Sequence, residues 1–437
     1  MVRAALAALL IGLAAPAPPA GLHVVARTDS TIQIAWRGAP GVAGHGVYVD
    51  GKRVAATRAK SYSFTGLGCG RTYSVAVDAY DSARHRSARA TVQAATATCL
   101  GAQPAPAPPP FVAASVFLAP TGSDANPCTQ ALPCSTFNRA YHAVRSGGRV
   151  EVAAGLYGCN EITRDPSKKA EVVFAPAAGA SVATTCELTI DGDRIEFDNM
   201  SLDGIRSDSA QYLTLRNVDV TCQDAAPYTL YPPGMCSAGV FLFAPVSNFA
   251  MLGGSVGPTW DAPGAPGQSQ VGIALGAVPG PSKNLLFDGV RFHDNRRSDD
   301  LQHTSCLMLG GGDGVTIRNS RFDNCAVFDL FVTWWNFVTP QYPVGTNILL
   351  EQNTFAQAVA GCNGCTAGYF SVEFADYPPM WQNVTIRNNT ALQSMHFDGR
   401  HQNFVVSGNT MPMLSYDCPK DIKYSRNVSN EGGAVCR

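Results

Sequence analysis

Side chains suited to acid–base chemistry gather in two short segments near the end of the chain. Residues 369–376 read YFSVEFAD and residues 394–400 read SMHFDGR. Apolar and polar residues alternate in both, which is typical of a strand that buries one face. If the apolar residues point inward, Glu373 and His396 point outward. Because adjacent strands of a sheet lie about 4.8 Å apart, this carboxylate and imidazole are predicted to lie within direct reach.

Four residues are the predicted catalytic set: Glu373, His396, Asp398 and Arg400. Carboxylate, imidazole and guanidinium groups together supply proton donors and acceptors. In a hydrolase, Glu373 and Asp398 would be the acid and base. In an eliminating enzyme, His396 or Arg400 would remove the proton. The alternative is a solvated sheet face on which such pairs only compensate charge.

Aromatic and polar residues in the same strands and loops are predicted to bind substrate, since aromatic faces stack on sugar rings. This predicted binding set is Trp335, Tyr342, Asp376, Trp381 and His401.

A second candidate site lies on a loop just before Cys306. Asp299 and Asp300 are adjacent there, and paired aspartates can ligate calcium. The alternative is a solvated loop whose aspartates pair with Arg296 and Arg297. Calcium is therefore a candidate cofactor, and no other cofactor is indicated.

The elements that must position these groups belong to a nine-residue phrase. Its eight copies begin at Arg194, Tyr212, Asn248, Asn284, Gly314, Asn347, Asn383 and Asn403. Phrase positions two and four are apolar in every copy, which predicts a strand. Position six is Asn, Gly or Gln, which favours a corner with positive φ, and position nine turns apolar again. Strand, corner and strand, repeated at variable spacing, predict the stacked rungs of a parallel β-helix.

Ahead of the repeats the chain has three predicted parts. Residues 1–20 have the short apolar run and small-residue end of a secretory signal peptide. Residues 22–98 contain short alternating strands with Trp36 as core aromatic and Tyr73 at a corner, and they resemble a fibronectin type III domain. Residues 99–115 form a Pro- and Ala-rich linker.

Residues 116–437 begin with a pattern of their own. TGSD at 121–124 is followed by a helix that Ser135 could cap, then by Gly147-Gly148 and a first strand. With the repeats, this opening resembles that of pectate-lyase-like right-handed β-helix proteins. The resemblance implies the fold and an extracellular carbohydrate-related role. The catalytic patterns of polygalacturonases and pectate lyases are absent from residues 116–437, so no catalytic residue is transferred by motif.

The 14 cysteines are an even number, as is usual for a disulfide-bonded secreted protein. Each cysteine is expected to pair with its neighbour in the sequence. Cys362 and Cys365 form a CxxC segment, for which the alternatives are a redox pair or half a zinc site. The expected pairs are Cys69–Cys99, Cys128–Cys134, Cys159–Cys186, Cys222–Cys236, Cys306–Cys325, Cys362–Cys365 and Cys418–Cys436.

Composition limits the class of partner. Hydrophobic residues make up 46% of the chain, enough for a large core, and the net charge of −1 argues against nucleic acid as the main partner. The sequence predicts a secreted monomer without a membrane span. Its expected function is binding and cleavage of an extracellular polysaccharide by a glycosidase or a lyase. The alternative is a non-catalytic carbohydrate-binding or adhesion protein.

Overall fold

The computed structural model divides the chain into two compact units, Met1–Gln103 and Pro104–Arg437. Most of the predicted signal peptide and linker lies outside the described residues. No helix in the described part of the chain is long and apolar enough to cross a membrane. The described residues are 15–27, 32–38, 40–64, 67, 71–96, 113–158, 160–222, 239–242, 246–260, 271–273, 282–296, 305–309, 312–332, 346–356, 370–375, 380–412, 418–429 and 435–436.

The first unit is an antiparallel β-sandwich, as expected for a fibronectin type III domain. One sheet has the order β1-β2-β5 and the other β4-β3-β6-β7. Trp36 is buried between them, and Leu67 and Tyr73 pack against the same core. The strands are β1 (Ala20–Arg27), β2 (Ile32–Arg37), β3 (Gly44–Val49), β4 (Lys52–Thr57), β5 (Ser61–Phe64), β6 (Thr72–Tyr80) and β7 (Ala90–Ala95).

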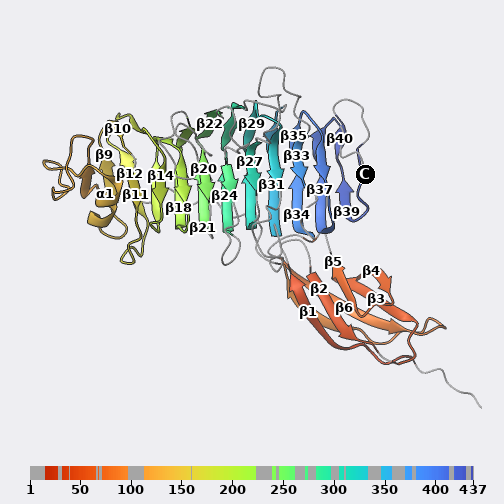
Figure 1. Cartoon of the computed structure of the whole chain (residues 1–437). Helices are drawn as coiled ribbons and strands as arrows, with labels where there is room; N and C mark the ends of the chain where they lie inside the picture. The colour runs from red at the N-terminus through yellow and green to blue at the C-terminus, as the bar shows by residue number, and fades with distance from the viewer. Residues whose placement is uncertain are drawn as a thin grey trace, which may run out of the picture. The chain divides into compact units, whose positions relative to one another are not determined.

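The second unit is a parallel β-helix, and its stacked rungs are visible in Figure 1. Each full rung passes through three parallel sheets in turn. The first sheet contains β8 (Val116–Leu118), β9 (Arg149–Val152), β12 (Val172–Pro176), β15 (Ile195–Asp198), β18 (Gln211–Arg216), β21 (Ser247–Leu252), β24 (Lys283–Asp288), β28 (Asp313–Arg318), β31 (Thr346–Glu351), β34 (Trp381–Arg387), β37 (His401–Ser407) and β39 (Ile422–Ser425).

The other two sheets follow the first around each rung. The second contains β10 (Gly155–Tyr157), β13 (Val182–Thr184), β16 (Ser201–Asp203), β19 (Asp219–Cys222), β22 (Ser255–Trp260), β25 (Arg291–His293), β26 (Asn295–Arg296), β29 (Arg321–Asp323), β32 (Thr354–Phe355), β35 (Thr390–Ala391), β38 (Thr410–Met411) and β40 (Val428–Ser429). The third contains β11 (Asn160–Ile162), β14 (Leu188–Ile190), β17 (Ile205–Ser207), β20 (Val240–Leu242), β23 (Val271–Ile273), β27 (Ser305–Leu309), β30 (Phe328–Val332), β33 (Phe370–Phe374) and β36 (Met395–Phe397).

The repeated phrase describes these rungs correctly. Its positions two and four lie in the first sheet and position nine in the second, and all are buried in the eight copies. Strands β28 and β31 pair in parallel, with Val315 opposite Ile348. Position six has positive φ in every copy, as predicted. Position one also has positive φ in every copy, which the sequence analysis did not anticipate. Each phrase therefore enters and leaves its strand through a left-handed residue.

A buried asparagine ladder joins the last rungs. Asn353, Asn389, Asn409 and Asn427 occupy one corner position in successive rungs. The side-chain amide of Asn389 donates to the carbonyl of Leu350 at 3.0 Å, and its Oδ1 accepts from the backbone N–H of Asn353 at 2.9 Å. The same pair of bonds recurs at Asn409 and Asn427. Polar groups inside the corner are thus satisfied from rung to rung.

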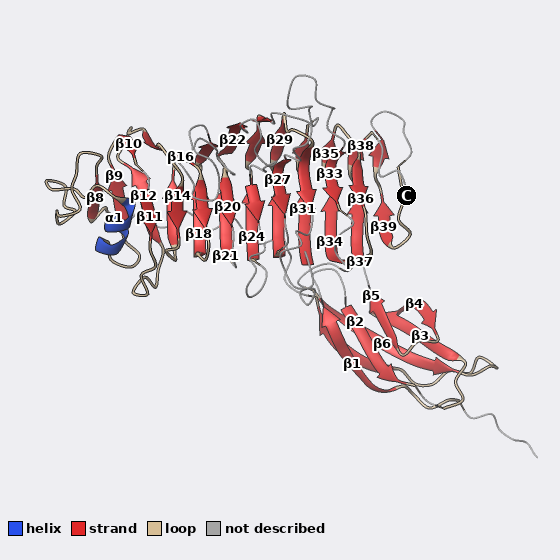
Figure 2. Cartoon of the chain, in the orientation of Figure 1, coloured by secondary structure: helices blue, strands red, loops and turns tan. Residues whose placement is uncertain are grey.

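A short helix packs at the start of the solenoid, seen in blue in Figure 2. This helix, α1 (Phe137–Ala143), buries Phe137, Ala140 and Tyr141. Its N-cap is Thr136, whose side chain accepts from the N–H of Arg139 at 3.1 Å. The predicted cap, Ser135, is wrong by one residue, because its hydroxyl and N–H are bonded to Asp124 instead. As predicted, the helix places apolar side chains in the first-rung core.

The disulfides agree with the neighbour pairing in two cases. Cys306–Cys325 and Cys418–Cys436 are bonded. Cys186 is also disulfide-bonded. The predicted Cys128–Cys134 bond is wrong: both are buried free thiols, and Cys134 Sγ lies 3.4 Å from the Phe117 carbonyl oxygen. The side chains of the other seven cysteines, Cys69, Cys99, Cys159, Cys222, Cys236, Cys362 and Cys365, lie outside the described residues.

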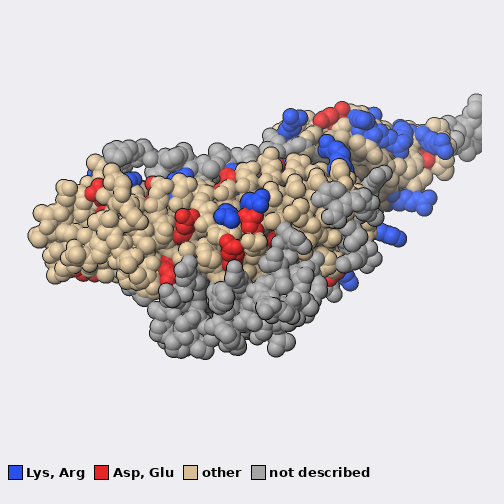
Figure 3. Space-filling view, turned by 90° about the horizontal axis from the view of Figure 1, so that it is seen from above, with Lys and Arg blue, Asp and Glu red and all other residues tan. Residues whose placement is uncertain are grey.

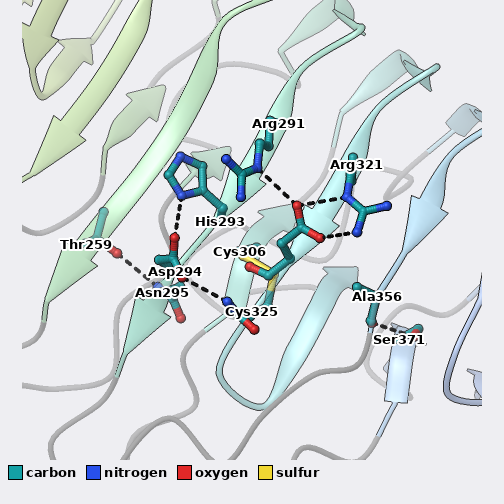
Figure 4. Close-up of a disulfide and its surroundings, with 12 residues drawn as sticks. Thr259, Arg291, His293, Asp294, Asn295, Cys306, Arg321, Cys325, Ala356 and Ser371 are labelled. Atoms are coloured by element: carbon teal, nitrogen blue, oxygen red, sulfur yellow. Dashed lines mark hydrogen bonds and ion pairs between the residues drawn. A yellow bond between two sulfur atoms is a disulfide. The ribbon is translucent and has the colours of Figure 1, made fainter.

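The Cys306–Cys325 bond ties strand β27 to the residues that follow β29, as Figure 4 shows. Beside it, Asp323 is held by Arg291 and Arg321 at 3.1 and 2.7 Å. Closing a loop over a separation of 19 residues restricts the unfolded chain. This corner is therefore fastened both covalently and by ion pairs.

We predict that replacing Cys306 and Cys325 together by alanine lowers the free energy of unfolding by about 3 kcal/mol. The measurement is chemical denaturation under non-reducing conditions. The matched control replaces Cys128 and Cys134, two buried thiols without a bond, and its loss should be clearly smaller. Equal losses in the two variants would show that the bond itself adds nothing.

Candidate functional site

The predicted site lies on the outer face of the third sheet, where β30, β33 and β36 are adjacent. The register places Phe331 opposite Glu373, and Glu373 opposite His396. The inward neighbours in these strands, such as Val372 and Met395, belong to the hydrophobic core. Strict alternation therefore sends Glu373 and His396 outward on consecutive rungs, as the sequence predicts.

Three side chains of this face form a continuous polar chain. The Nδ1 atom of His396 lies 3.0 and 2.9 Å from the two carboxylate oxygens of Glu373. On the other side of the ring, Nε2 lies 3.3 Å from Oδ1 of Asp398. The backbone N–H of Asp398 donates to the carbonyl of Phe374 at 2.9 Å, which fixes its place after β36. We call Glu373, His396 and Asp398 the proton cluster.

Exposure increases along the cluster. The side chain of Glu373 is 10% exposed, that of His396 21% and that of Asp398 42%. The ring of Phe370 stacks on the imidazole with centroids 4.8 Å apart. Together with Phe331 in the neighbouring strand, it gives the cluster an apolar side. Glu373 is therefore buried and does not lie in the open groove that the alternation alone suggests.

Burial determines how the Glu373 carboxyl titrates. Desolvation raises its pKa above the ordinary value, and the nearby Asp398 charge acts in the same direction. The hydrogen bond and positive charge of His396 oppose this rise in pKa. The carboxylate is consequently coupled to the protonation of the imidazole.

The geometry permits proton transfer at one defined atom. A protonated imidazole can donate to Glu373 through Nδ1 and to Asp398 through Nε2 at the same time. A neutral imidazole whose Nδ1–H stays bonded to Glu373 has a lone pair at Nε2. His396 can therefore take up and release a proton at Nε2 without losing its orienting bond, which is the requirement for a general acid or base.

The same three residues could instead share a cation. One ligand atom from each lies within 4.8 Å of the other two. A carboxylate-rich set with a single imidazole suits a divalent ion that accepts oxygen and nitrogen ligands. Such an ion would replace the hydrogen bonds of His396. Among the described residues this is the group with suitable spacing.

The remaining predicted site residues do not join the proton cluster in the described structure. Arg400 is exposed just beyond β36, with its carbonyl accepting from the N–H of Trp381 at 2.8 Å. Trp381 is fully buried against Phe374, so its predicted role in a substrate groove is wrong. The residues Trp335, Tyr342, Asp376, Asp299 and Asp300 lie outside the described residues, and their predicted roles stay predictions.

His401 is also not a surface ligand. Its side chain is fully buried, and Nδ1 lies 3.1 Å from Oδ1 of Asp421 in the next rung. The ring packs edge-on against Phe404 in the core. His401 begins β37 two residues before the phrase starts at Asn403, so the phrase pattern does not predict its direction. The left-handed Asn403 interrupts the strand alternation.

One carboxylate near this face, Asp329 in β30, is absent from the predicted set. It is completely buried, and among the described residues neither carboxylate oxygen has a partner with good hydrogen-bond geometry, although the nearby Ser371 hydroxyl partly stabilises its charge. The register places it beside Ser371, whose hydroxyl is directed at the carbonyl of Ala356 at 3.5 Å. Desolvation raises the pKa of Asp329 well above its ordinary value. The alternation in DLFV, with Leu330 and Val332 inward, already places this residue on the same outer face as Glu373.

Comparisons with known proteins give short matches. No protein-family model matches the chain. A poly(3-hydroxybutyrate) depolymerase of Ralstonia pickettii is 33% identical over 78 residues, which is 18% of this chain and 16% of that enzyme. The chain therefore matches about a sixth of the relative's length.

Similar solved structures cover comparable shares of the chain. The crystal structure of FN3tt is 23% identical and covers 20% of this chain and 98% of its own, with a TM-score of 0.18. The spore cortex lytic enzyme SleM of Clostridium perfringens is 17% identical, covers 18% of this chain and 28% of its own, and has a TM-score of 0.17. The β-helix fold is therefore established by the strand order and register of this chain and not by these matches.

We predict that Asp329→Asn removes a pH dependence of stability. The folded chain holds the Asp329 proton at pH values where the unfolded chain has released it, so wild-type stability falls as pH rises above the unfolded pKa of about 4. The slope from this one group is about 1.4 kcal/mol per pH unit up to its folded pKa. The isosteric amide should be the more stable form at neutral pH, as measured by denaturation between pH 4 and 8. Parallel stability curves for the two proteins would contradict the prediction.

Proposed function

We propose that the β-helix unit binds an extracellular polysaccharide over the outer face of β30, β33 and β36 and cleaves it by proton transfer at His396. The observation that carries the proposal is the proton cluster. A buried carboxylate orients one ring nitrogen, and the other nitrogen meets a half-exposed carboxylate. A charge-compensating surface pair needs no burial and no third member.

The geometry assigns a different role to each member. Both oxygens of Glu373 are directed at Nδ1 of His396, so Glu373 is a positioning residue. It fixes the tautomer and stabilises the imidazolium, as a buried carboxylate does in other carboxylate–histidine pairs. His396 and Asp398 are the groups exposed enough to meet a substrate. This changes the sequence-based expectation that Glu373 is itself the acid.

Two ways of breaking a glycosidic bond suit this arrangement. In elimination, Nε2 of His396 takes the C5 proton of a uronate, a C4–C5 double bond forms, and the departing C4 oxygen takes up a proton. Arg400 would then face the uronate carboxylate. In hydrolysis, His396 and Asp398 act as acid and base, and water adds across the broken bond. Both routes need Nε2 accessible and Nδ1 held.

One relative supports a degradative role. The matched protein of Ralstonia pickettii is a depolymerase, an enzyme that breaks down a polymer. The opening of residues 116–437 and the parallel rungs suit a pectate-lyase-like protein. We therefore propose kinship with that family. Disulfides such as Cys306–Cys325 and Cys418–Cys436 are typical of a secreted chain.

We predict that His396→Asn lowers polysaccharide turnover by about 100-fold or more, since general acid–base catalysis contributes at least that much. Glu373→Gln should lower it by at least about tenfold while leaving polymer affinity within about twofold, because the amide cannot stabilise the imidazolium. The assay incubates the purified chain with a panel of neutral and acidic polysaccharides. New reducing ends report both reactions, and absorbance of unsaturated uronates reports elimination alone.

The matched control is His85→Asn in the sandwich, where Nδ1 lies 2.9 Å from an oxygen of Asp81 in a similar imidazole–carboxylate pair. Turnover should not change there. If the wild-type chain binds a polymer but produces neither signal, cleavage is excluded and the binding-only alternative holds.

A further inference from the structure

The two units carry opposite charge. Met1–Gln103 contains eleven Lys and Arg residues against four Asp and no Glu, a formal charge of +7. Pro104–Arg437 contains 21 Lys and Arg against 29 Asp and Glu, a formal charge of −8. The whole-chain value of −1 is the difference between these two large terms. Each unit therefore presents a field of its own to a charged partner.

The positive charge of the sandwich is at its surface. Figure 3 shows Lys and Arg side chains gathered over this unit. Its three described acids leave most of that charge unpaired: Asp78 is buried against Arg86, Asp81 is bonded to His85, and Asp50 accepts from the N–H of Ser74 at 2.8 Å. Nine basic side chains of the described sandwich are exposed: Arg37, Lys52, Arg53, Arg58, Lys60, Arg71, Arg84, Arg86 and Arg89.

Several of these cations surround one tyrosine on the outer face of the sheet β4-β3-β6-β7. Tyr48 donates to Asp78 at 2.6 Å and accepts from Arg86 at 3.0 Å. The guanidinium of Arg89 lies over its ring, 3.7 Å from the centroid. Arg53 pairs in register with Tyr48, so its side chain lies on the same face. We call Arg53 and Arg89, with Tyr48 between them, the basic face.

The basic face is held in shape beneath its charges. Gly46 lies under it, and a Cβ there would meet Asp78 at 2.5 Å and Arg86 at 2.8 Å. The Asp78–Arg86 pair thus packs directly on the strand and fixes Tyr48. Arg53 and Arg89 remain exposed. Arg89 donates one bond to the carbonyl of Gly51 at 3.4 Å, and its other guanidinium N–H groups can donate to a ligand. A rigid support with exposed guanidinium groups favours the binding of a polymer that carries repeated anionic groups.

We propose that the basic face binds an acidic polysaccharide and holds the chain on it. A membrane surface fits less well, since the exposed large apolar residues of the described sandwich are only Val25 and Val54. Single-stranded nucleic acid is bound by stacking on aromatic faces, whereas here Trp36 is buried and Arg89 covers Tyr48. The solenoid disulfides are typical of proteins outside the cytoplasm, where acidic polysaccharides are found. This binding is independent of the proposed cleavage and would hold for an inert solenoid.

The experiment measures binding of sodium polygalacturonate to the full chain in the His396→Asn background, so that the polymer stays intact. Combined replacement of Arg53 and Arg89 by glutamine should weaken binding by at least about tenfold. The single change Arg53→Gln, at an exposed side chain, should weaken it about threefold and guards against a folding defect in the double variant. Binding should also decline steeply with added salt, because it releases counterions.

The matched control removes two charges from the solenoid, at Arg164 and Arg321, whose side chains are similarly exposed. Its affinity should stay within about twofold of the parent. Three results would overturn the proposal: equal losses in the two double variants, unchanged affinity in the sandwich variants, or equal binding of neutral dextran. Equally tight binding of duplex DNA or phosphatidylglycerol vesicles at the same ionic strength would overturn the assignment to a polysaccharide.

Discussion

The rest of the solenoid depends on the parallel hydrogen-bonded stacking of its rungs. Each rung can satisfy its backbone only through its neighbours, so every strand must keep the register of the one before it. The left-handed residues at phrase positions one and six make this possible, since they turn the chain sharply at the same height in each copy. Loops of any length can then leave the rungs without disturbing the register. Glu373 and His396 meet for this reason, although 23 residues separate them.

Much of this arrangement could be predicted because it has a period. Apolar residues at fixed phrase positions determine which side chains face the core, and alternation then gives the outward positions, including Glu373 and His396. The direction of side chains that lie outside the repeated phrase could not be predicted in this way. Trp381 and His401 lie at strand ends, where alternation no longer indicates direction, and both turn into the core. Whether an outward residue is solvated depends on what covers it, which explains why Glu373 and Asp329 are buried.

The net charge of the whole chain also conceals a feature that depends on the fold. A whole-chain sum of −1 describes a neutral molecule only if the charges are mixed, and here they are separated by unit. The negative formal charge of the solenoid argues against nucleic acid as its partner. The sandwich, with a formal charge of +7, is not limited in this way. Sequence can reveal this separation once the domain boundary is known, but only the strand register shows that Arg53 and Tyr48 share a face.

The burial of Glu373 is costly for stability, because a carboxylate loses its water when it is covered by protein. Its bonds to His396 offset part of that cost, and a hydrophobic residue at the same place would offset all of it. A solenoid gains nothing structural from such a group, since its core is complete without it. The opposite case is the asparagine ladder, where each buried amide satisfies backbone groups that would otherwise be unpaired. Under the proposed function the cost has a purpose, because dry surroundings would strengthen the field of Glu373 at His396.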